Sequence, residues 1–251
     1  SRAALHHWEE PCLSGTKGSG TVFFSSCSLG CVFCQNYEIS TGGAGKEISI
    51  ERLSEIFLEL QSQGAHNINL VTPTHFVPQI REALMLSKEN GLTLPIVYNT
   101  GSYDSLETIK SLEGLIDIYL PDLKYYDDKY AIKYSRAKDY FKTASAAIEE
   151  MYRQVGEPSF NEDGIMTKGV IVRHMMLPGL LFDSKKIIDY LYNTFGDSIY
   201  ISIMNQYTPT HRAKQYKEIS KPLNQRHYDA LIDYALDLGI TNAFIQEEGT
   251  A

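Results

Sequence analysis

The sequence has only four cysteines in 251 residues, and no apolar run approaches the roughly 18 residues of a membrane-spanning helix. So few cysteines do not make a disulfide scaffold, and a chain of this length can bury a core without cross-links. The first ten residues, "SRAALHHWEE", lack an initiator Met and the apolar core of a signal peptide. We therefore expect a cytoplasmic protein with no membrane partner, trimmed at its N-terminus.

Positive charge is also scarce, since 23 Lys and Arg stand against 31 Asp and Glu, for a net charge of −8. The densest basic stretch, "HRAKQYKEISKPLNQR", lies in an expected loop and is interrupted by Glu218. Phosphate backbones are bound by clustered Lys and Arg. We therefore expect no nucleic-acid partner.

Short β-branched runs alternate with amphipathic segments along the whole chain. The expected strands are residues 21–26, 67–72, 95–99, 115–120, 169–175 and 198–204, with 242–246 as a candidate for one more. The expected helices include one that Ser49 caps and Gly64 ends, and a last one that Asn224 caps. Residues 126–165 hold more helix than one crossover needs.

Near-continuous apolar strands separated by helices indicate a parallel sheet that is buried on both faces. Six such units predict an α/β fold, a partial (β/α)6 TIM-like barrel, and no linker divides it, so residues 1–251 are expected to form one domain. In this architecture the working residues lie at the carboxyl ends of the strands. The segments there are the cysteines of "SSCSLGCVFC" and residues 72–75, 99–103, 121–124, 173–179 and 205–209.

Three of the four cysteines, Cys27, Cys31 and Cys34, lie within eight positions. Structural zinc normally takes four ligands in two separated pairs, and the fourth cysteine stands alone far upstream. Spacings of three and then two residues place three thiolates on one face of a cube, which suits a [4Fe–4S] cluster with one open iron. A zinc site and inert thiols are the alternatives.

The segment "CSLGCVFC" resembles the C-x3-C-x-aromatic-C motif of the radical S-adenosylmethionine (SAM) superfamily. The blocks "EEPCLSGTKGSGTVFFSSCSLGCVFCQNYEIS", "INLVTPTHFVPQI", "PIVYNT", "DIYLPDLKY" and "NQYTP" are similar to those of the pyruvate formate-lyase activating enzyme-like group. The resemblance implies that SAM binds the open iron and that one electron cleaves it to methionine and a 5′-deoxyadenosyl radical, which abstracts a hydrogen atom.

The resemblance also implies the site residues. Cys27, Cys31 and Cys34 are the expected iron ligands, and Phe33 is either beside the adenine or an ordinary core residue. The family's Gly-Gly-Glu, which receives the SAM amino group, is replaced by Thr72-Pro73-Thr74. This replacement leaves backbone carbonyls and the hydroxyls of Thr72 and Thr74 as the expected acceptors.

The other expected SAM contacts come from later strands. Asn99 and Thr100 match an Asp-Thr pair near the SAM carboxylate, and Arg173 resembles the partner of that carboxylate. Asp122 and Lys124 resemble a family pair that builds a monovalent-cation site or polar clamp beside SAM; the alternative is a rim ion pair. The remaining candidates are weaker: Gln206 and His75 at the rim, His174 in the core, and Cys12 as a buried or truncation-exposed thiol, with an extra ligand or a reactive thiol as the alternative.

Three functions fit these expectations. The first is a radical SAM enzyme that activates a glycyl-radical protein, and the second applies the same radical to a small molecule or another peptide site. The third is a non-catalytic iron–sulfur or zinc protein that serves in electron transfer or structure. An exposed low-potential cluster also implies an electron donor such as flavodoxin or ferredoxin.

Overall fold

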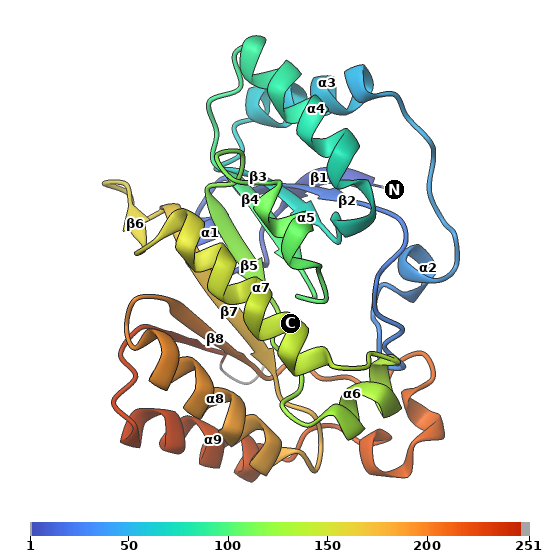
Figure 1. Ribbon diagram of the computed structural model, residues 1–251, viewed down its shortest axis with the longest axis vertical. Coiled ribbons are helices and arrows are strands. Elements are labelled where there is room, and N and C mark those ends of the chain that lie inside the picture. The colour runs from blue at the N-terminus through green and yellow to red at the C-terminus, as the bar shows by residue number, and fades with distance from the viewer. Residues whose placement is uncertain (1, 247–251) are drawn as a thin grey trace.

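The computed structural model describes residues 2–246, and a curved, mostly parallel sheet forms its centre (Figure 1). The strand order is β1-β2-β3-β4-β5-β7-β8-β9, and every pair from β2 to β9 is parallel. The strands are β1 Arg2–His6, β2 Ser19–Phe23, β3 Ile68–Val71, β4 Ile96–Thr100, β5 Ile118–Pro121, β7 Met166–Met175, β8 Tyr200–Met204 and β9 Ala243–Ile245, while β6 Ser159–Phe160 pairs with β7. The sheet is open, which confirms the predicted partial barrel.

Two features of the sheet differ from the prediction. β1 pairs antiparallel with β2, so an additional strand precedes the first expected one. The first expected strand, residues 21–26, ends at Phe23 instead, because the chain bends away and Ser26 takes a positive φ of 72°. This bend begins the cysteine loop.

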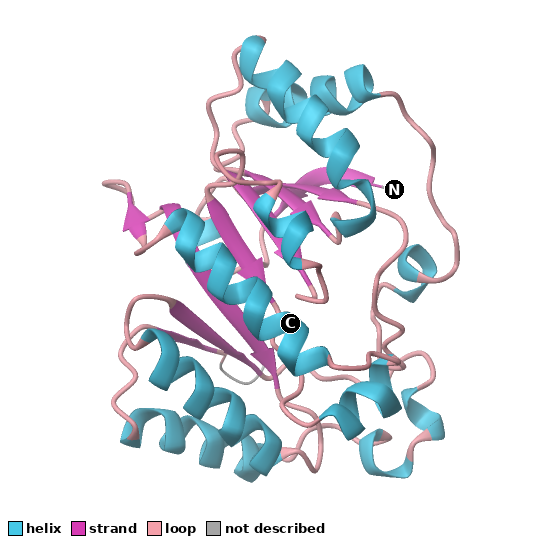
Figure 2. Cartoon of the chain, viewed as in Figure 1, coloured by secondary structure: helices cyan, strands magenta, loops and turns pink. Residues whose placement is uncertain are grey.

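Most of the longer helices cover the outer face of the sheet (Figure 2), and the nine α-helices of residues 2–246 have the following bounds. They are α1 Pro11–Ser14, α2 Tyr37–Ser40, α3 Ile50–Ser62, α4 Val77–Glu89, α5 Leu106–Lys110, α6 Asp128–Ser135, α7 Tyr140–Val155, α8 Leu181–Phe195 and α9 Gln225–Asp237. Both predicted caps are confirmed, since Ser49 accepts the Arg52 N–H and Asn224 accepts the Arg226 N–H. Within residues 2–246, no helix has the length and apolar character needed to cross a membrane.

Alternation along the strands divides the buried side chains into two cores. In β4, Tyr98 faces outward into the large cluster between the sheet and the helices, whereas Val97 faces inward. The inner cluster consists of Cys12, Leu13, Val97, Ile118, Leu120, Met166 and Ile171. Since Cys12 and Leu13 belong to α1, this short helix lies inside the barrel and fills it.

Candidate active site

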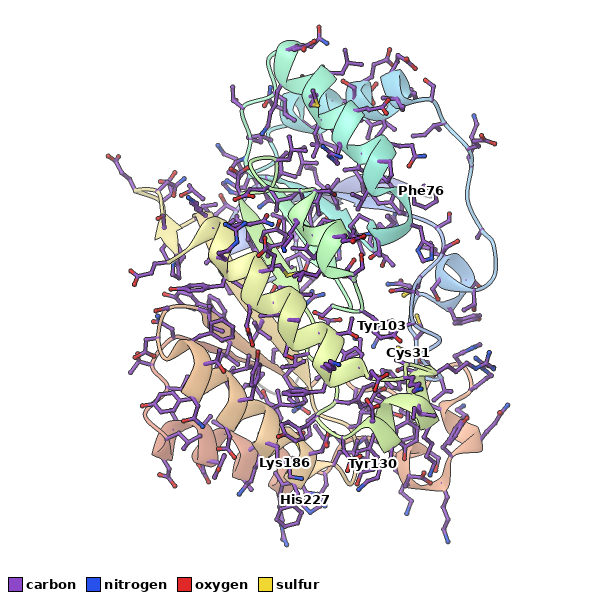
Figure 3. All side chains as sticks on the ribbon, viewed as in Figure 1. Cys31, Phe76, Tyr103, Tyr130, Lys186 and His227 are labelled. Atoms are coloured by element: carbon purple, nitrogen blue, oxygen red, sulfur yellow. The ribbon has the colours of Figure 1, made fainter. Side chains whose placement is uncertain are left out.

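The loop between β2 and α2, residues 24–36, carries the three clustered cysteines, Cys27, Cys31 and Cys34, all free thiols. Backbone hydrogen bonds tie this loop to the end of α6. The Gly30 N–H donates to the Ser135 carbonyl at 2.9 Å, and the Val32 N–H donates to the Tyr134 carbonyl at 2.8 Å. Figure 3 shows Cys31 at this junction. A distant helix therefore holds the loop in place.

Each thiol has a polar neighbour at its sulfur. The Ser135 hydroxyl donates to the Cys31 Sγ at 3.0 Å, and the Leu29 N–H donates to the Cys27 Sγ at 3.4 Å. The sulfur of the third cysteine lies 3.4 Å from the Ser40 Oγ. Hydrogen bonds of this kind stabilise anionic sulfur and tune iron–sulfur clusters.

Without metal, the Cys27 and Cys31 thiols hold their protons. Burial raises the pKa of Cys31 to about 11, although the positive charge of Lys124 opposes this. Burial also raises the pKa of Cys27, and the Leu29 N–H and Lys124 partly offset it. Metal binding at these sulfurs must therefore release protons.

No three Cys, His, Asp or Glu side chains in residues 2–246 form a group that could hold a single metal ion. A cube-shaped cluster makes a different demand, since each thiolate binds its own iron. Three free thiols on one loop, with hydrogen-bond donors at their sulfurs, fit that donor set.

A cluster of charged side chains forms where β5 and β7 end. The Lys124 Nζ lies 2.7 Å from the Asp122 Oδ2, and the Arg173 Nε donates to the Asp122 Oδ1 at 2.8 Å. The Arg173 Nη2 also donates to the Asn99 Oδ1 at 2.7 Å. Four predicted site residues from three strand ends therefore lie in direct contact.

Two further residues join this cluster that sequence reasoning missed. The Glu9 Oε2 accepts from the Arg173 Nη1 at 3.3 Å, and its Oε1 accepts from the Asn69 Nδ2 at 3.1 Å. Asn69 could have been noticed, because it is a polar residue inside an apolar strand. Glu9 carried no such signal, since only the fold brings the segment before α1 into the barrel.

The charges of the cluster compensate one another. Burial alone would raise the pKa of Asp122, but Arg173 and Lys124 together lower it. Burial opposes the charge on Lys124, yet the Asp122 carboxylate raises the pKa of Lys124 overall. Burial raises the pKa of Glu9, and Arg173 works against that change. Asp122 is therefore held as the anion between two cations.

The segment that replaces Gly-Gly-Glu is a tight turn after β3. Thr72 has a φ of +57°, unusual for a β-branched residue, and its N–H donates to the Asn99 carbonyl at 2.9 Å. Farther along, the Asp104 carboxylate accepts from the Thr100 hydroxyl at 2.6 Å and from the Tyr98 hydroxyl at 3.0 Å. The Thr100 hydroxyl therefore points toward Asp104, on the helical side of β4, and Thr74 lies near the same carboxylate.

Phe33 and Gln206 lie where the cysteine loop meets the loop after β8. Phe33 is buried and packs edge-on against Tyr207, with ring centroids 5.9 Å apart. The Gln206 carbonyl accepts from the Gln35 Nε2 at 3.2 Å. His75 is exposed beside Thr74.

The two expected core residues are buried. His174 faces the helical side of β7, between the Leu123 carbonyl and the Ser184 hydroxyl. Cys12 lies in the inner core, and burial raises its pKa to about 12.

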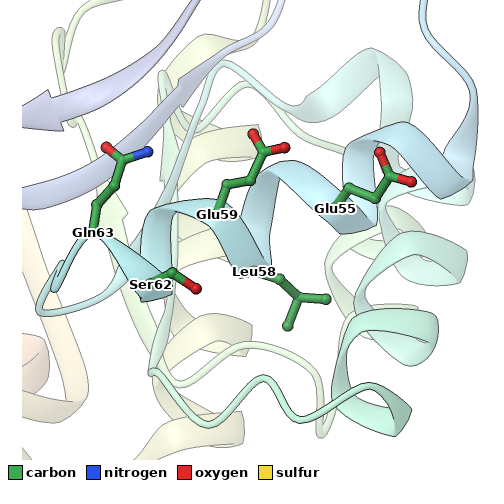
Figure 4. Close-up of a pocket in the computed structure, with 5 residues that line it drawn as sticks. All are labelled: Glu55, Leu58, Glu59, Ser62 and Gln63. Atoms are coloured by element: carbon green, nitrogen blue, oxygen red, sulfur yellow. The ribbon is translucent and has the colours of Figure 1, made fainter.

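A shallow hollow elsewhere lies on α3 (Figure 4). It is lined by Glu55, Leu58, Glu59, Ser62 and Gln63. No strand-end residue contributes to it, so the chemistry places the candidate site at the cysteine loop instead.

Solved structures with similar folds were found. SuiB of Streptococcus suis has a TM-score of 0.60 at 16% identity, over 91% of this chain and 49% of that chain. The protein anSMEcpe, solved with AdoMet bound, has a TM-score of 0.61 at 12% identity, over 90% of this chain and 63% of that chain. A domain of pyruvate-formate lyase-activating enzyme from Bacteroides vulgatus has a TM-score of 0.51 at 12% identity, over 70% of this chain and 94% of that chain. At these identities the likeness shows the fold alone.

Sequence comparison finds a relative and a family. An uncharacterized protein of Methanocaldococcus jannaschii is 28% identical over 234 residues, covering 88% of this chain and 64% of that protein. The chain therefore spans less than two thirds of this relative's length. The pattern that defines the Radical SAM superfamily matches residues 21–191, which include all three clustered cysteines. Because this match covers more than half of the chain, the protein belongs to the radical SAM superfamily.

Proposed function

We propose that residues 1–251 act as one catalytic domain that cleaves SAM reductively and directs the resulting radical to abstract a hydrogen atom. One observation carries this proposal: Leu29 of the cysteine loop and Lys124 of the charged cluster lie against the same residue, since a Cβ at Gly101 would be 2.7 Å from the Leu29 Cδ1 and 3.7 Å from the Lys124 Cε, and Lys124 pairs with Asp122. The cysteine loop and the charged cluster therefore belong to one site, as a cluster-bound SAM requires.

In this proposal the residues have separate tasks. Cys27, Cys31 and Cys34 hold a [4Fe–4S] cluster, which when bound supplies the low-potential electron. Arg173 pairs with the SAM carboxylate, a task that suits a planar guanidinium. Asp122 holds Arg173 and Lys124 in place.

The remaining predicted contacts surround this centre. Thr72 and Thr74 offer backbone carbonyls and hydroxyls to the SAM amino group, in place of the family's Gly-Gly-Glu. The Thr100 hydroxyl donates to the Asp104 carboxylate, so we propose that Thr100 contacts SAM through its backbone. Other SAM contacts are proposed for Asn99, Phe33 and Gln206. A monovalent cation beside Asp122 is the alternative to a purely polar clamp.

For the substrate, we propose a protein or peptide, with glycyl-radical activation as the leading reaction. Two similar folds support this: SuiB was solved with its precursor peptide SuiA, and anSMEcpe with a Cp18Cys peptide. The similarity to the pyruvate-formate lyase-activating enzyme domain supports the glycyl subtype. We further propose flavodoxin or ferredoxin as the electron donor and an oxygen-poor cytoplasm as the setting.

The central test is SAM cleavage. Anaerobically reconstituted protein, reduced and mixed with SAM, should release 5′-deoxyadenosine and methionine. Reduced protein that contains a cluster but forms no 5′-deoxyadenosine would favour a non-catalytic iron–sulfur protein.

A matched pair of cysteine variants tests the ligand assignment. Cys31→Ala should lose the iron and the visible absorbance of the cluster, whereas Cys12→Ala should retain both, because Cys12 lies in the inner core. Equal iron content in the two variants would contradict the assignment.

The subtype needs a separate assay. Incubation with candidate glycyl-radical proteins should produce a glycyl signal in electron paramagnetic resonance. Turnover of a metabolite without any such signal would favour a small-molecule substrate.

A further inference from the structure

The segment between β1 and α1 places a carboxylate inside the barrel. Glu9 directly precedes Glu10, and α1 follows with Cys12 and Leu13 in the inner core. The Glu9 N–H donates to the Ser14 hydroxyl at 3.0 Å, which holds the segment against its own helix. The Glu9 side chain is only 10% exposed.

The Glu9 carboxylate links two strands that are not neighbours. One oxygen accepts from Asn69 in β3 and the other from Arg173 in β7, while β4 and β5 lie between those strands in the sheet. Because the barrel is open, its strands do not close into a hydrogen-bonded ring that would fix the distance between β3 and β7. The Glu9 side chain contacts both strands and can fix that distance.

Arg173 is held on three sides as a result. Its Nε donates to Asp122, its Nη2 to Asn99 and its Nη1 to Glu9. A guanidinium has five N–H donors, so one hydrogen on each of Nη1 and Nη2 is left after these three bonds. Three partners from three directions fix the plane of the group, which is what a bidentate contact to a carboxylate needs.

Charge balance gives Glu9 a second role. Asp122 alone faces two cations, Lys124 and Arg173. Glu9 adds a second carboxylate that is hydrogen-bonded to Arg173, whereas the buried Glu10 acts on Arg173 through its charge alone. Without Glu9, the one carboxylate left in hydrogen-bond contact with Arg173 is Asp122, which also pairs with Lys124, and Arg173 could turn toward it.

We propose that Glu9 is a positioning residue of the SAM site, which orients Arg173 toward the SAM carboxylate by tying it to Asn69 across the barrel. This inference rests on the proposed function, because it takes Arg173 as the partner of that carboxylate.

The test compares SAM with decarboxylated SAM, which differs only by the carboxylate. Dissociation constants of both are measured for reconstituted wild-type protein, Glu9→Ala and Glu10→Ala. Glu10 is the matched control, because its charge also acts on Arg173, but among the described residues its side chain makes no hydrogen bond to Arg173 or Asn69. The pair of variants therefore separates the loss of the hydrogen bonds from the loss of a nearby negative charge.

Glu9→Ala should weaken SAM binding about tenfold, the size expected when a hydrogen bond to a charged group is lost. Binding of decarboxylated SAM should stay within about twofold, so the preference for the carboxylate shrinks. Glu10→Ala should keep the wild-type preference. A purely structural role would instead weaken both ligands equally.

The outcomes are distinguishable. If wild-type protein binds its cluster but not SAM, the proposed function fails, and this inference fails with it. If wild-type protein binds SAM and Glu9→Ala keeps the wild-type preference, only the role of Glu9 is overturned. Should Glu9→Ala not fold, Glu9→Asp decides: it keeps the charge but is one methylene shorter, and an unchanged preference there would equally overturn the proposal.

Discussion

His174 makes the stability of this protein depend on pH in a way that can be calculated. Its Nδ1 lies 2.7 Å from the Leu123 carbonyl, which can only accept, so Nδ1 carries the proton. The neutral ring therefore accepts the Ser184 hydroxyl at Nε2, at 2.9 Å. Burial lowers the pKa of His174 to about 4, although the hydrogen bond to Leu123 opposes this.

The sign follows from counting protons. In the unfolded chain the imidazole titrates near 6.5, well above its pKa in the folded protein. Between those values the unfolded state binds more protons, so stability falls as the pH drops from about 6.5 toward 4. The loss from this group is negligible at pH 7.5 and reaches about 2 kcal/mol at pH 5.

The assay is urea unfolding of wild-type protein and His174→Asn at pH 7.5 and pH 5. Asn keeps an N–H for the Leu123 carbonyl but cannot titrate. The other histidines and the carboxylates are present in both proteins, so their contributions cancel. Wild-type protein should lose about 2 kcal/mol more than the variant between the two pH values. Equal losses, or a His174 ring that titrates near 6.5 by NMR, would refute the reasoning.

Three further predictions concern single side chains. Ser135→Ala removes the donor at the Cys31 sulfur and should make the cluster potential more negative by about 40 mV at most, as measured by a redox titration with electron paramagnetic resonance. Asp104→Ala removes the acceptor that the buried Tyr98 and Thr100 hydroxyls share; it should lower the free energy of unfolding at pH 7 by about 2 kcal/mol, because both hydroxyls lose their partner, and an unchanged urea midpoint would contradict this. Ser49→Ala removes the cap of α3 and should cost about 1 kcal/mol in the same assay, without changing SAM cleavage.

Most secondary elements could be predicted because their causes are local. Ser49 caps the helix that follows it, and the strands are apolar runs because both faces of a parallel sheet are buried. β1 could not be predicted in this way. It is a short edge strand that pairs antiparallel with β2, and in the sequence α1 stands between the two strands.

Some contacts of the candidate site were also predictable from the sequence, and others were not. Asp122 and Arg173 were predictable as neighbours, because the carboxyl ends of adjacent parallel strands meet at one edge. The direction of the Thr100 hydroxyl was not, since its acceptor Asp104 lies four residues later, in the loop before α5.

The sequence by itself determined the superfamily and the spacing of the three proposed ligands, because Cys27, Cys31 and Cys34 lie within one short segment. It also determined which strand ends carry polar residues. The tertiary structure alone decided that Glu9 reaches Arg173, 164 positions away, and that it also reaches Asn69. Contacts across the inside of a barrel depend on how every strand between them is placed, and no local pattern in the sequence records that distance.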